Sequence, residues 1–301
     1  MFTRYCRSVL VTPATAVDRY ASCHRSGADI CCVDLEDSVP AHRKEEARRL
    51  ATGFFASANG PAAPPCAIRI NAVTEPDGLA DLLALRHYPV KPAIVLIPKV
   101  ESARDVEIVE HVLGRDCPRL ELFAVIETPR GVERLAEIAT SSHRLRALIF
   151  GAADYAMEVG SDLSWDPLAH VRGRLVNSAR AAGRHVIDSP TFALTDLSLV
   201  HREAVLAQRL GFSGKIALHP RQVPVIGSVF SPGADQLELA GRIVAAAERS
   251  GQGVTTVDGT MVGRPFFEAS RRLLDEFGPV PETPETAVTD RDLTHPDGGS
   301  R

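Results

Sequence analysis

The chain has 301 residues, of which 45% are hydrophobic and 24% charged, and its formal net charge is −4. These fractions are typical of a globular protein whose length allows one large α/β barrel or two smaller domains. Basic and acidic residues are interspersed, so we expect neither a nucleic-acid nor a membrane partner. No apolar run reaches the length of a membrane span, and no apolar signal core follows the first charges, which predicts a cytoplasmic location.

Strand-like and helix-like segments alternate along most of the chain. Short apolar runs predict strands at Ser8–Thr12, Ile30–Leu35, Ala67–Asn71, Ala93–Pro98, Leu122–Thr128, Ala147–Gly151, His185–Asp188 and Lys215–His219. Amphipathic segments predict helices near Val17–Ser26, His42–Ala58, Gly78–His87, Ala103–Leu113, Val132–Ser141, Pro167–Ala182 and Leu197–Leu210. Eight βα units favour a TIM (β/α)8 barrel at residues 1–230. An open doubly wound sheet is the second choice, because no dinucleotide-binding glycine pattern follows the first strand.

The sequence changes in kind after the eighth predicted strand. A break at Ser231-Pro232-Gly233 precedes a helical apolar stripe over Ala234–Ser250, a short turn-rich stretch and a final helical pattern over Phe266–Phe277. We therefore predict a C-terminal helical cap at residues 231–277 rather than a ninth βα unit. Residues 278–301 contain few apolar side chains and are expected to form a disordered tail.

Charged residues recur where the predicted strands end. Ligands bind at the carboxyl ends of parallel strands in α/β folds, and charged groups there are costly unless they are paired or bound to a metal. Glu127 and Asp154 follow neighbouring strands, and two hard oxygen ligands predict a divalent-metal site. For a single strand-end charge, such as Glu101 or Asp188, an ordinary ion pair on a solvated rim is an equal alternative.

Seven strings resemble, in order and spacing, the citrate lyase β-subunit family, which includes malyl-CoA lyases and belongs to the HpcH/HpaI aldolase superfamily. They extend from about Arg7 to Phe277. The strings are Arg7-Ser8-Val9-Leu10, Ala28-Asp29 followed by Val33-Asp34-Leu35-Glu36-Asp37-Ser38-Val39-Pro40, Ile68-Arg69-Ile70-Asn71, Ile97-Pro98-Lys99-Val100-Glu101-Ser102, Ile126-Glu127-Thr128-Pro129-Arg130-Gly131-Val132, Phe150-Gly151-Ala152-Ala153-Asp154, and Gly211-Phe212-Ser213-Gly214-Lys215-Ile216-Ala217-Leu218-His219-Pro220.

The resemblance implies a Mg²⁺-dependent carbon–carbon lyase, with Mn²⁺ as the alternative ion. Its substrate would be a 3-hydroxyacyl-CoA thioester such as malyl-, citramalyl- or citryl-CoA, cleaved to or formed from an acyl-CoA and a 2-keto acid. The family forms trimers or pairs of trimers, so a homotrimer or a dimer of trimers is expected. The implied site residues are Glu127 and Asp154 for Mg²⁺, Arg69 for the substrate oxyanion, Glu36 and Asp37 as catalytic residues beside the metal, and Arg19 and Lys99 as further substrate-binding residues.

Two departures from the family pattern keep other functions open. Gly263 stands where the family has an aspartate that serves as an acid or base in a neighbouring subunit, including for thioester hydrolysis; Asp258 is a candidate substitute. This change favours a catalytically reduced binding or assembly subunit. The loop Thr12–Arg19 lacks the family's glycine near the CoA, although Arg19 persists. That change favours a CoA-independent class II aldolase acting on hydroxy-keto acids.

Overall fold

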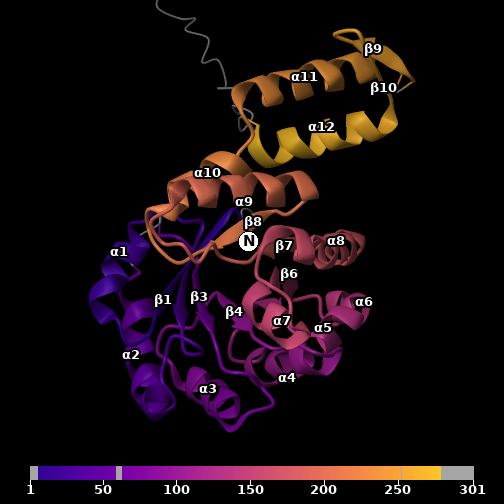
Figure 1. The fold of residues 1–301 in the computed structure, drawn as a ribbon. Coiled ribbons are helices and arrows are strands. Elements are labelled where there is room, and N and C mark those ends of the chain that lie inside the picture. The colour runs from indigo at the N-terminus through magenta and orange to yellow at the C-terminus, as the bar shows by residue number, and fades with distance from the viewer. Residues whose placement is uncertain (1–5, 59–62, 252, 279–301) are drawn as a thin grey trace, which may run out of the picture. The chain divides into compact units, whose positions relative to one another are not determined.

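A computed structural model describes residues 6–58, 63–251 and 253–278 (Figure 1). The chain divides into two compact units, Met1–Pro232 and Gly233–Arg301. The first unit contains eight parallel strands that pair in sequence order, and β1 also pairs with β8 to close a barrel. The strands are β1 (Ser8–Pro13), β2 (Ile30–Asp34), β3 (Cys66–Arg69), β4 (Ile94–Ile97), β5 (Glu121–Ile126), β6 (Leu145–Phe150), β7 (His185–Asp188) and β8 (Gly214–Ala217). The predicted TIM barrel is therefore confirmed.

Helices surround the closed barrel (Figure 1). They are η1 (Val17–Arg19), α1 (Tyr20–His24), η2 (Ala41–Arg43), α2 (Lys44–Ala56), α3 (Pro76–His87), α4 (Ala103–Leu113), α5 (Pro129–Glu133), α6 (Leu135–Thr140), α7 (Ala152–Val159), α8 (Trp165–Ala181), α9 (Leu197–Leu210) and α10 (Gln222–Phe230). The single helix predicted at Val132–Ser141 is wrong, because Arg134 leaves the helical conformation and separates α5 from α6. Helices α7 and α10 were not predicted.

The strands separate two sets of buried side chains, because successive residues of a strand face opposite sides. One set, which includes Ile30, Cys32, Leu96, Val125 and Ile149, forms a cluster of its own. The alternate residues pack in a larger cluster with the surrounding helices. All six cysteines are buried and none forms a disulfide. The barrel therefore holds its strand ends on a packed and rigid scaffold.

Over residues 233–251 and 253–278, the second unit contains two helices and a hairpin. Helices α11 (Ala234–Arg249) and α12 (Arg264–Phe277) correspond to the two helical patterns of the predicted cap, whose boundary at residues 230/231 stays a prediction. Strands β9 (Thr255–Val257) and β10 (Thr260–Val262) form an antiparallel hairpin that the sequence had indicated only as turn-rich. The predicted tail lies outside the described residues except for Gly278.

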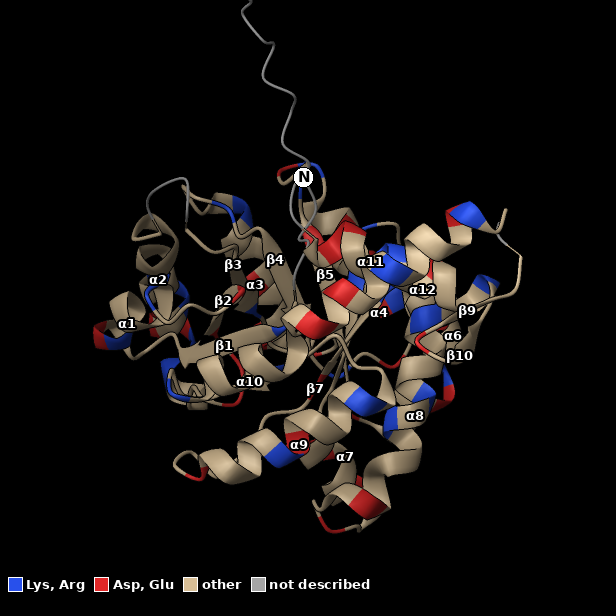
Figure 2. Cartoon of the chain, turned by 90° about the horizontal axis from the view of Figure 1, so that it is seen from above, with Lys and Arg blue, Asp and Glu red and all other residues tan. Residues whose placement is uncertain are grey.

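Charged residues of both signs are interspersed along helices such as α4 and α8 (Figure 2). In the described part of the chain, every helix is too short or too polar to cross a lipid bilayer.

Candidate functional site

A cavity of about 340 Å³ lies at the carboxyl ends of the barrel strands. Its lining residues lie in different strands or in the loops and helix that follow them, so the barrel brings together segments that are far apart in the sequence. These residues are Val11, Asp37, Ser38, Arg69, Leu96, Val125, Glu127, Ile149, Phe150, Gly151, Ala152, Ala153, Asp154, Pro190, Phe192, Ile216 and Leu218.

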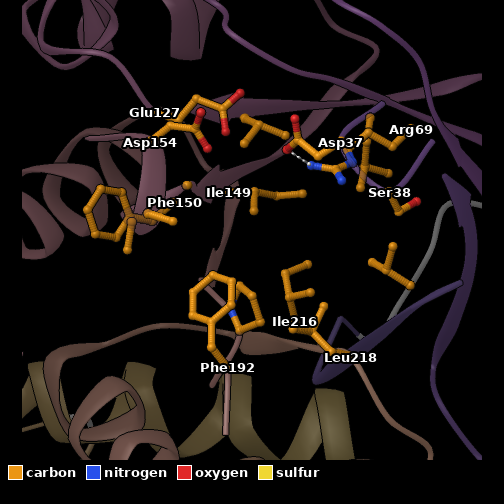
Figure 3. Close-up of a pocket in the computed structure, with 17 residues that line it drawn as sticks. Asp37, Ser38, Arg69, Glu127, Ile149, Phe150, Asp154, Phe192, Ile216 and Leu218 are labelled. Carbon is orange, nitrogen blue, oxygen red and sulfur yellow. Dashed lines mark hydrogen bonds and ion pairs between the residues drawn. The ribbon is translucent and has the colours of Figure 1, made fainter. Parts of the chain in front are cut away.

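Glu127 and Asp154 lie side by side on one side of this cavity (Figure 3). Glu127 is the residue after β5 and is only 2% exposed. The sequence had suggested that Asp154 lies at a strand end, but in the structure it lies in the first turn of α7. Burial, together with the charge of Asp154, raises the pKa of Glu127 to about 7. Two neighbouring carboxylates of this kind favour a bound cation.

The surroundings of these carboxylates fit a divalent metal. The backbone N–H of Lys99 donates to Oε1 of Glu127 at 2.8 Å, and Nζ of Lys99 donates to Oδ1 of Asp154 at 3.0 Å. Lys99 has a φ of 51°, an uncommon conformation for a side-chain-bearing residue. Gly151 leaves room for the site, because a Cβ there would overlap Cβ and Oε2 of Glu127.

The chemistry of the donor set also agrees with magnesium. Within the described residues, no group of three or more His, Cys, Asp and Glu side chains is arranged to hold a metal ion. A site with two carboxylates leaves the remaining positions to water or to oxygen atoms of a ligand, which is how Mg²⁺ is commonly bound. Glu127 and Asp154 are therefore suited to Mg²⁺ rather than to a fully protein-coordinated ion.

Arg69, the last residue of β3, is held by buried Asp34. Its Nε and Nη2 donate to the two carboxylate oxygens of Asp34 at 2.7 and 2.8 Å. Burial alone would raise the pKa of Asp34, but the charge of Arg69 outweighs it and holds that pKa below its ordinary value. Asp34 and Arg69 also lie opposite each other in the register of β2 and β3. The pairing of these strands therefore helps to fix the position of the guanidinium.

Glu36 and Asp37 flank the same guanidinium. Nη1 of Arg69 lies 2.7 Å from Oε2 of Glu36, in an ion-pair contact, and 3.3 Å from Oδ2 of Asp37. Burial raises the pKa of Glu36 to about 9 despite the nearby charge of Arg69. Asp37 lines the cavity with a side chain that is 57% exposed, whereas Glu36 lies behind the cavity wall.

Arg19 lies elsewhere. It ends η1 and lines a neighbouring cavity of about 540 Å³, together with His219 and Arg221. The two cavities share Val11 and Leu218 as lining residues. The structure therefore brings Glu127, Asp154, Arg69 and Asp37 into one cavity. Lys99 contacts Asp154, and Glu36 contacts Arg69. Arg19 lies in the neighbouring cavity.

The sequence did not assign a role to some residues in or near the site. Asp34 was visible as a strand-end carboxylate, and its place opposite Arg69 follows from strand register. Gly151 appears in a matched string, but its contact with Glu127 becomes apparent only in three dimensions. Asp188 is fully buried and paired with Arg172 at 2.8 Å and Lys215 at 2.9 Å, so it is a core ion pair rather than a rim charge. Phe192, after β7, had no sequence signal.

Known proteins resemble this chain over most of its length. A (3S)-malyl-CoA thioesterase from Cereibacter sphaeroides is 35% identical over 273 residues, which cover 89% of this chain and 93% of the relative. The citrate lyase subunit beta of Escherichia coli is 31% identical over 286 residues, covering 90% and 93%. The chain spans nearly the full length of both relatives.

Solved structures agree with this similarity. CitE from Mycobacterium tuberculosis, in complex with magnesium, acetoacetate and coenzyme A, has a TM-score of 0.76 and 29% identity, covering 92% of this chain and 100% of that chain. RipC from Yersinia pestis has a TM-score of 0.69 and 36% identity, covering 78% and 100%. The sequence pattern of the HpcH/HpaI aldolase/citrate lyase family matches residues 7–220. With this match over more than half of its length, the chain belongs to the HpcH/HpaI aldolase/citrate lyase family.

Proposed function

We propose that this chain is a Mg²⁺-dependent carbon–carbon lyase that cleaves or forms a 3-hydroxyacyl-CoA thioester, with an acyl-CoA and a 2-keto acid as the other partners. The observation that carries the proposal is the placement of Glu127 and Asp154 in one cavity with Arg69. Magnesium and coenzyme A in the related CitE structure support the choice of metal and of thioester.

Glu127 and Asp154 would hold the metal, and Lys99 would keep both carboxylates in place. When bound, Mg²⁺ acts as a Lewis acid on the oxygen atoms of a 2-keto or 2-hydroxy acid. The amide of Lys99 orients Glu127, and its ammonium group orients Asp154. Ala152, Ala153 and Asp154 at the start of α7 line the same cavity, and the N–H groups of a first helical turn suit the acid's carboxylate.

Arg69 would stabilise charge that develops during the reaction. In the cleavage direction the substrate hydroxyl gives its proton to a base and becomes the carbonyl of the keto acid as the carbon–carbon bond breaks. The thioester fragment leaves as an enolate, which takes up a proton to give the acyl-CoA. A guanidinium stays protonated, and its fixed N–H groups can donate to the enolate oxygen without reorganising. Asp34 fixes the orientation of Arg69, and we assign Glu36 and Asp37 to the same task beside the metal.

The neighbouring cavity suits the CoA part of the substrate. Arg19 and Arg221 provide cations there, and phosphate groups favour such partners. Val11 and Leu218 line both cavities, so a thioester that passes them would extend from the second cavity into the first. We further propose a cytoplasmic homotrimer or dimer of trimers.

Calorimetric titration with Mg²⁺ tests the metal site. We expect Glu127→Gln and Asp154→Asn each to weaken binding by about tenfold or more, since each removes one of two charged ligands. Glu101→Gln, which removes an exposed carboxylate paired with Arg130, is the matched control and should change little. Unchanged Mg²⁺ affinity in both site variants would refute the assignment.

The same protein then separates the alternative functions. Turnover that requires an acyl-CoA, measured by separating the products, supports the thioester lyase. Turnover of hydroxy-keto acids without CoA would instead identify a class II aldolase. Mg²⁺ binding without turnover of either substrate class would identify a binding or assembly subunit.

A further inference from the structure

The cavity has two chemically different sides. The carboxylates of Glu127 and Asp154 and the guanidinium of Arg69 occupy one side, and Phe192, Ile216 and Leu218 lie on the opposite side (Figure 3). The apolar residues that line the cavity come from six different strands or the loops after them: Val11, Leu96, Val125, Ile149, Phe150, Pro190, Phe192, Ile216 and Leu218. If a ligand binds the metal through its reacting oxygen atoms, the rest of the ligand would therefore lie against the apolar side of the cavity.

A second carboxylate would find no cation on that wall. Arg69 is the one Lys or Arg side chain among the lining residues that the structure describes. Its guanidinium already contacts three carboxyl groups, those of Asp34, Glu36 and Asp37. Lys99 pairs with Asp154 on the metal side and is absent from the lining. An unpaired carboxylate against apolar side chains carries a large desolvation cost.

We propose that the 2-keto acid of this enzyme is a monocarboxylate with an apolar side chain, rather than a dicarboxylate. This inference rests on the proposed function. The thioester occupies the side of Val11 and Leu218 next to the Arg19 cavity, which leaves the wall around Ile149 and Phe192 to the side chain of the keto acid. Phe192 is 49% exposed, so part of this apolar surface would gain cover when a ligand lies against it.

Calorimetry with a matched ligand pair tests the proposal. 4-Methyl-2-oxopentanoate and oxaloacetate have side chains of similar shape, with an isopropyl group in place of a carboxylate. With Mg²⁺ present, we expect the first to bind at least tenfold more tightly. Along the series pyruvate, 2-oxobutyrate and 2-oxopentanoate, affinity should rise about fourfold per methylene, which corresponds to about 0.8 kcal/mol each.

A charge introduced at Phe192 should reverse the preference. Phe192→Arg places a cation on the apolar wall, and its half-exposed position makes the substitution compatible with folding. We expect it to tighten oxaloacetate and weaken 4-methyl-2-oxopentanoate, each by about tenfold, at unchanged Mg²⁺ affinity. Leu163→Arg adds the same charge at a similarly exposed residue that does not line the cavity, and should leave both affinities unchanged.

The outcomes separate this inference from the proposed function. Mg²⁺-dependent binding in which oxaloacetate equals or exceeds 4-methyl-2-oxopentanoate overturns the inference alone. The inference would also be overturned if affinity rose with the number of methylenes in the acyl-CoA instead of in the keto acid. The apolar wall would then hold the acyl group. Keto acids that bind equally well with and without Mg²⁺, or none that binds at all, would overturn the proposed function as well.

Discussion

Arg69 lies among three carboxyl groups, and this arrangement makes use of a planar guanidinium. Its Nε and Nη2 bind both oxygens of Asp34, while Nη1 contacts Glu36 and Asp37. A lysine carries the same charge but cannot bind Asp34 at two points at once. The orientation of the positive group, rather than its charge alone, therefore distinguishes the two residues at this position.

Arg69→Lys should separate charge from geometry. We expect Mg²⁺ affinity to change by less than about threefold, because Glu127 and Asp154 remain. We expect kcat/KM to fall by about 100-fold or more, the size of effect seen when one donor to a developing oxyanion is lost. Calorimetry and steady-state kinetics measure the two quantities. Turnover equal to that of the unmodified enzyme would eliminate the oxyanion role of Arg69.

Gly151 offers a way to disturb the metal site without removing a ligand. A methyl group at Gly151 would overlap Cβ of Glu127, which is close to the backbone and cannot rotate away. We expect Gly151→Ala to weaken Mg²⁺ binding by about 10–100-fold, as changes to residues that position ligands commonly do. Gly173→Ala in α8, where a Cβ meets nothing within 4 Å, is the control and should leave the affinity unchanged. Equal affinities for the two variants would show that Gly151 has no part in placing Glu127.

At the level of elements, the strands could be predicted, but the short helices α7 and α10 could not. The apolar runs that form β1 to β8 are bounded by polar and turn residues, so each was found within a few residues. Helix α7 has only eight residues, too few for a helical period to show, and it follows Gly151 and ends at left-handed Gly160. For this reason Asp154 was expected at a strand end. The apolar periodicity of Val132–Ser141 continues through Arg134, so the sequence did not reveal the break between α5 and α6.

Strand β7 begins with His185, which should make stability depend on pH. Burial, with the charges of Arg180 and Arg146, lowers the pKa of His185 from 6.5 to about 4. Between these values the unfolded chain binds a proton that the folded protein does not, so stability falls as pH decreases from about 6.5 to 4. The contribution is about 2–3 kcal/mol.

Denaturant unfolding at pH 7 and at pH 4.5 measures this contribution. We expect His185→Gln to lose less stability between the two pH values than the unmodified protein does, because glutamine cannot take up the proton. His111→Gln, on an exposed face of α4, should leave the difference unchanged. A pH dependence that is the same in all three proteins would show that His185 is not its source.

For the whole molecule, the sequence predicted the barrel better than the site, for a physical reason. The cavity combines the last residue of β3 with residues that follow β2, β5, β6, β7 and β8, and only closure of the barrel brings them together. Strand-end chemistry identified Glu127, and the resemblance added a role for Arg69. Contacts such as that of Asp34 with Arg69, or the position of Phe192, depend on strand register and loop paths, which no local pattern specifies.

The second unit shows what Gly263 and Asp258 do locally. Gly263 is the N-cap of α12 with an extended backbone, and a Cβ there would meet only Cγ2 of Val254 at 3.6 Å, an ordinary contact. An aspartate therefore fits, and it would also be a good N-cap. Asp258 lies in the β9–β10 turn with a φ of 50° and pairs with Arg242 at 2.9 Å. Asp258 therefore has a structural partner within the second unit.

The last prediction concerns thioester hydrolysis, which requires activation of a water molecule at the thioester carbonyl. With acetyl-CoA, Mg²⁺ and either glyoxylate or pyruvate, we expect the unmodified enzyme to accumulate the 3-hydroxyacyl-CoA and to release little free hydroxy acid. Gly263→Asp should increase release of the acid and CoA by about tenfold or more, since it adds a carboxylate that can act as a general base. Product separation at several times measures both species.

Asp258→Asn is the matched control, because asparagine keeps the turn conformation and cannot act as the base. We expect it to leave the products unchanged. If the unmodified enzyme releases free acid as fast as it forms the thioester, and Asp258→Asn does not slow that release, then the absent aspartate is not needed for hydrolysis. If Asp258→Asn abolishes the release, Asp258 has taken over the role that a resemblance to malyl-CoA lyases assigns to position 263.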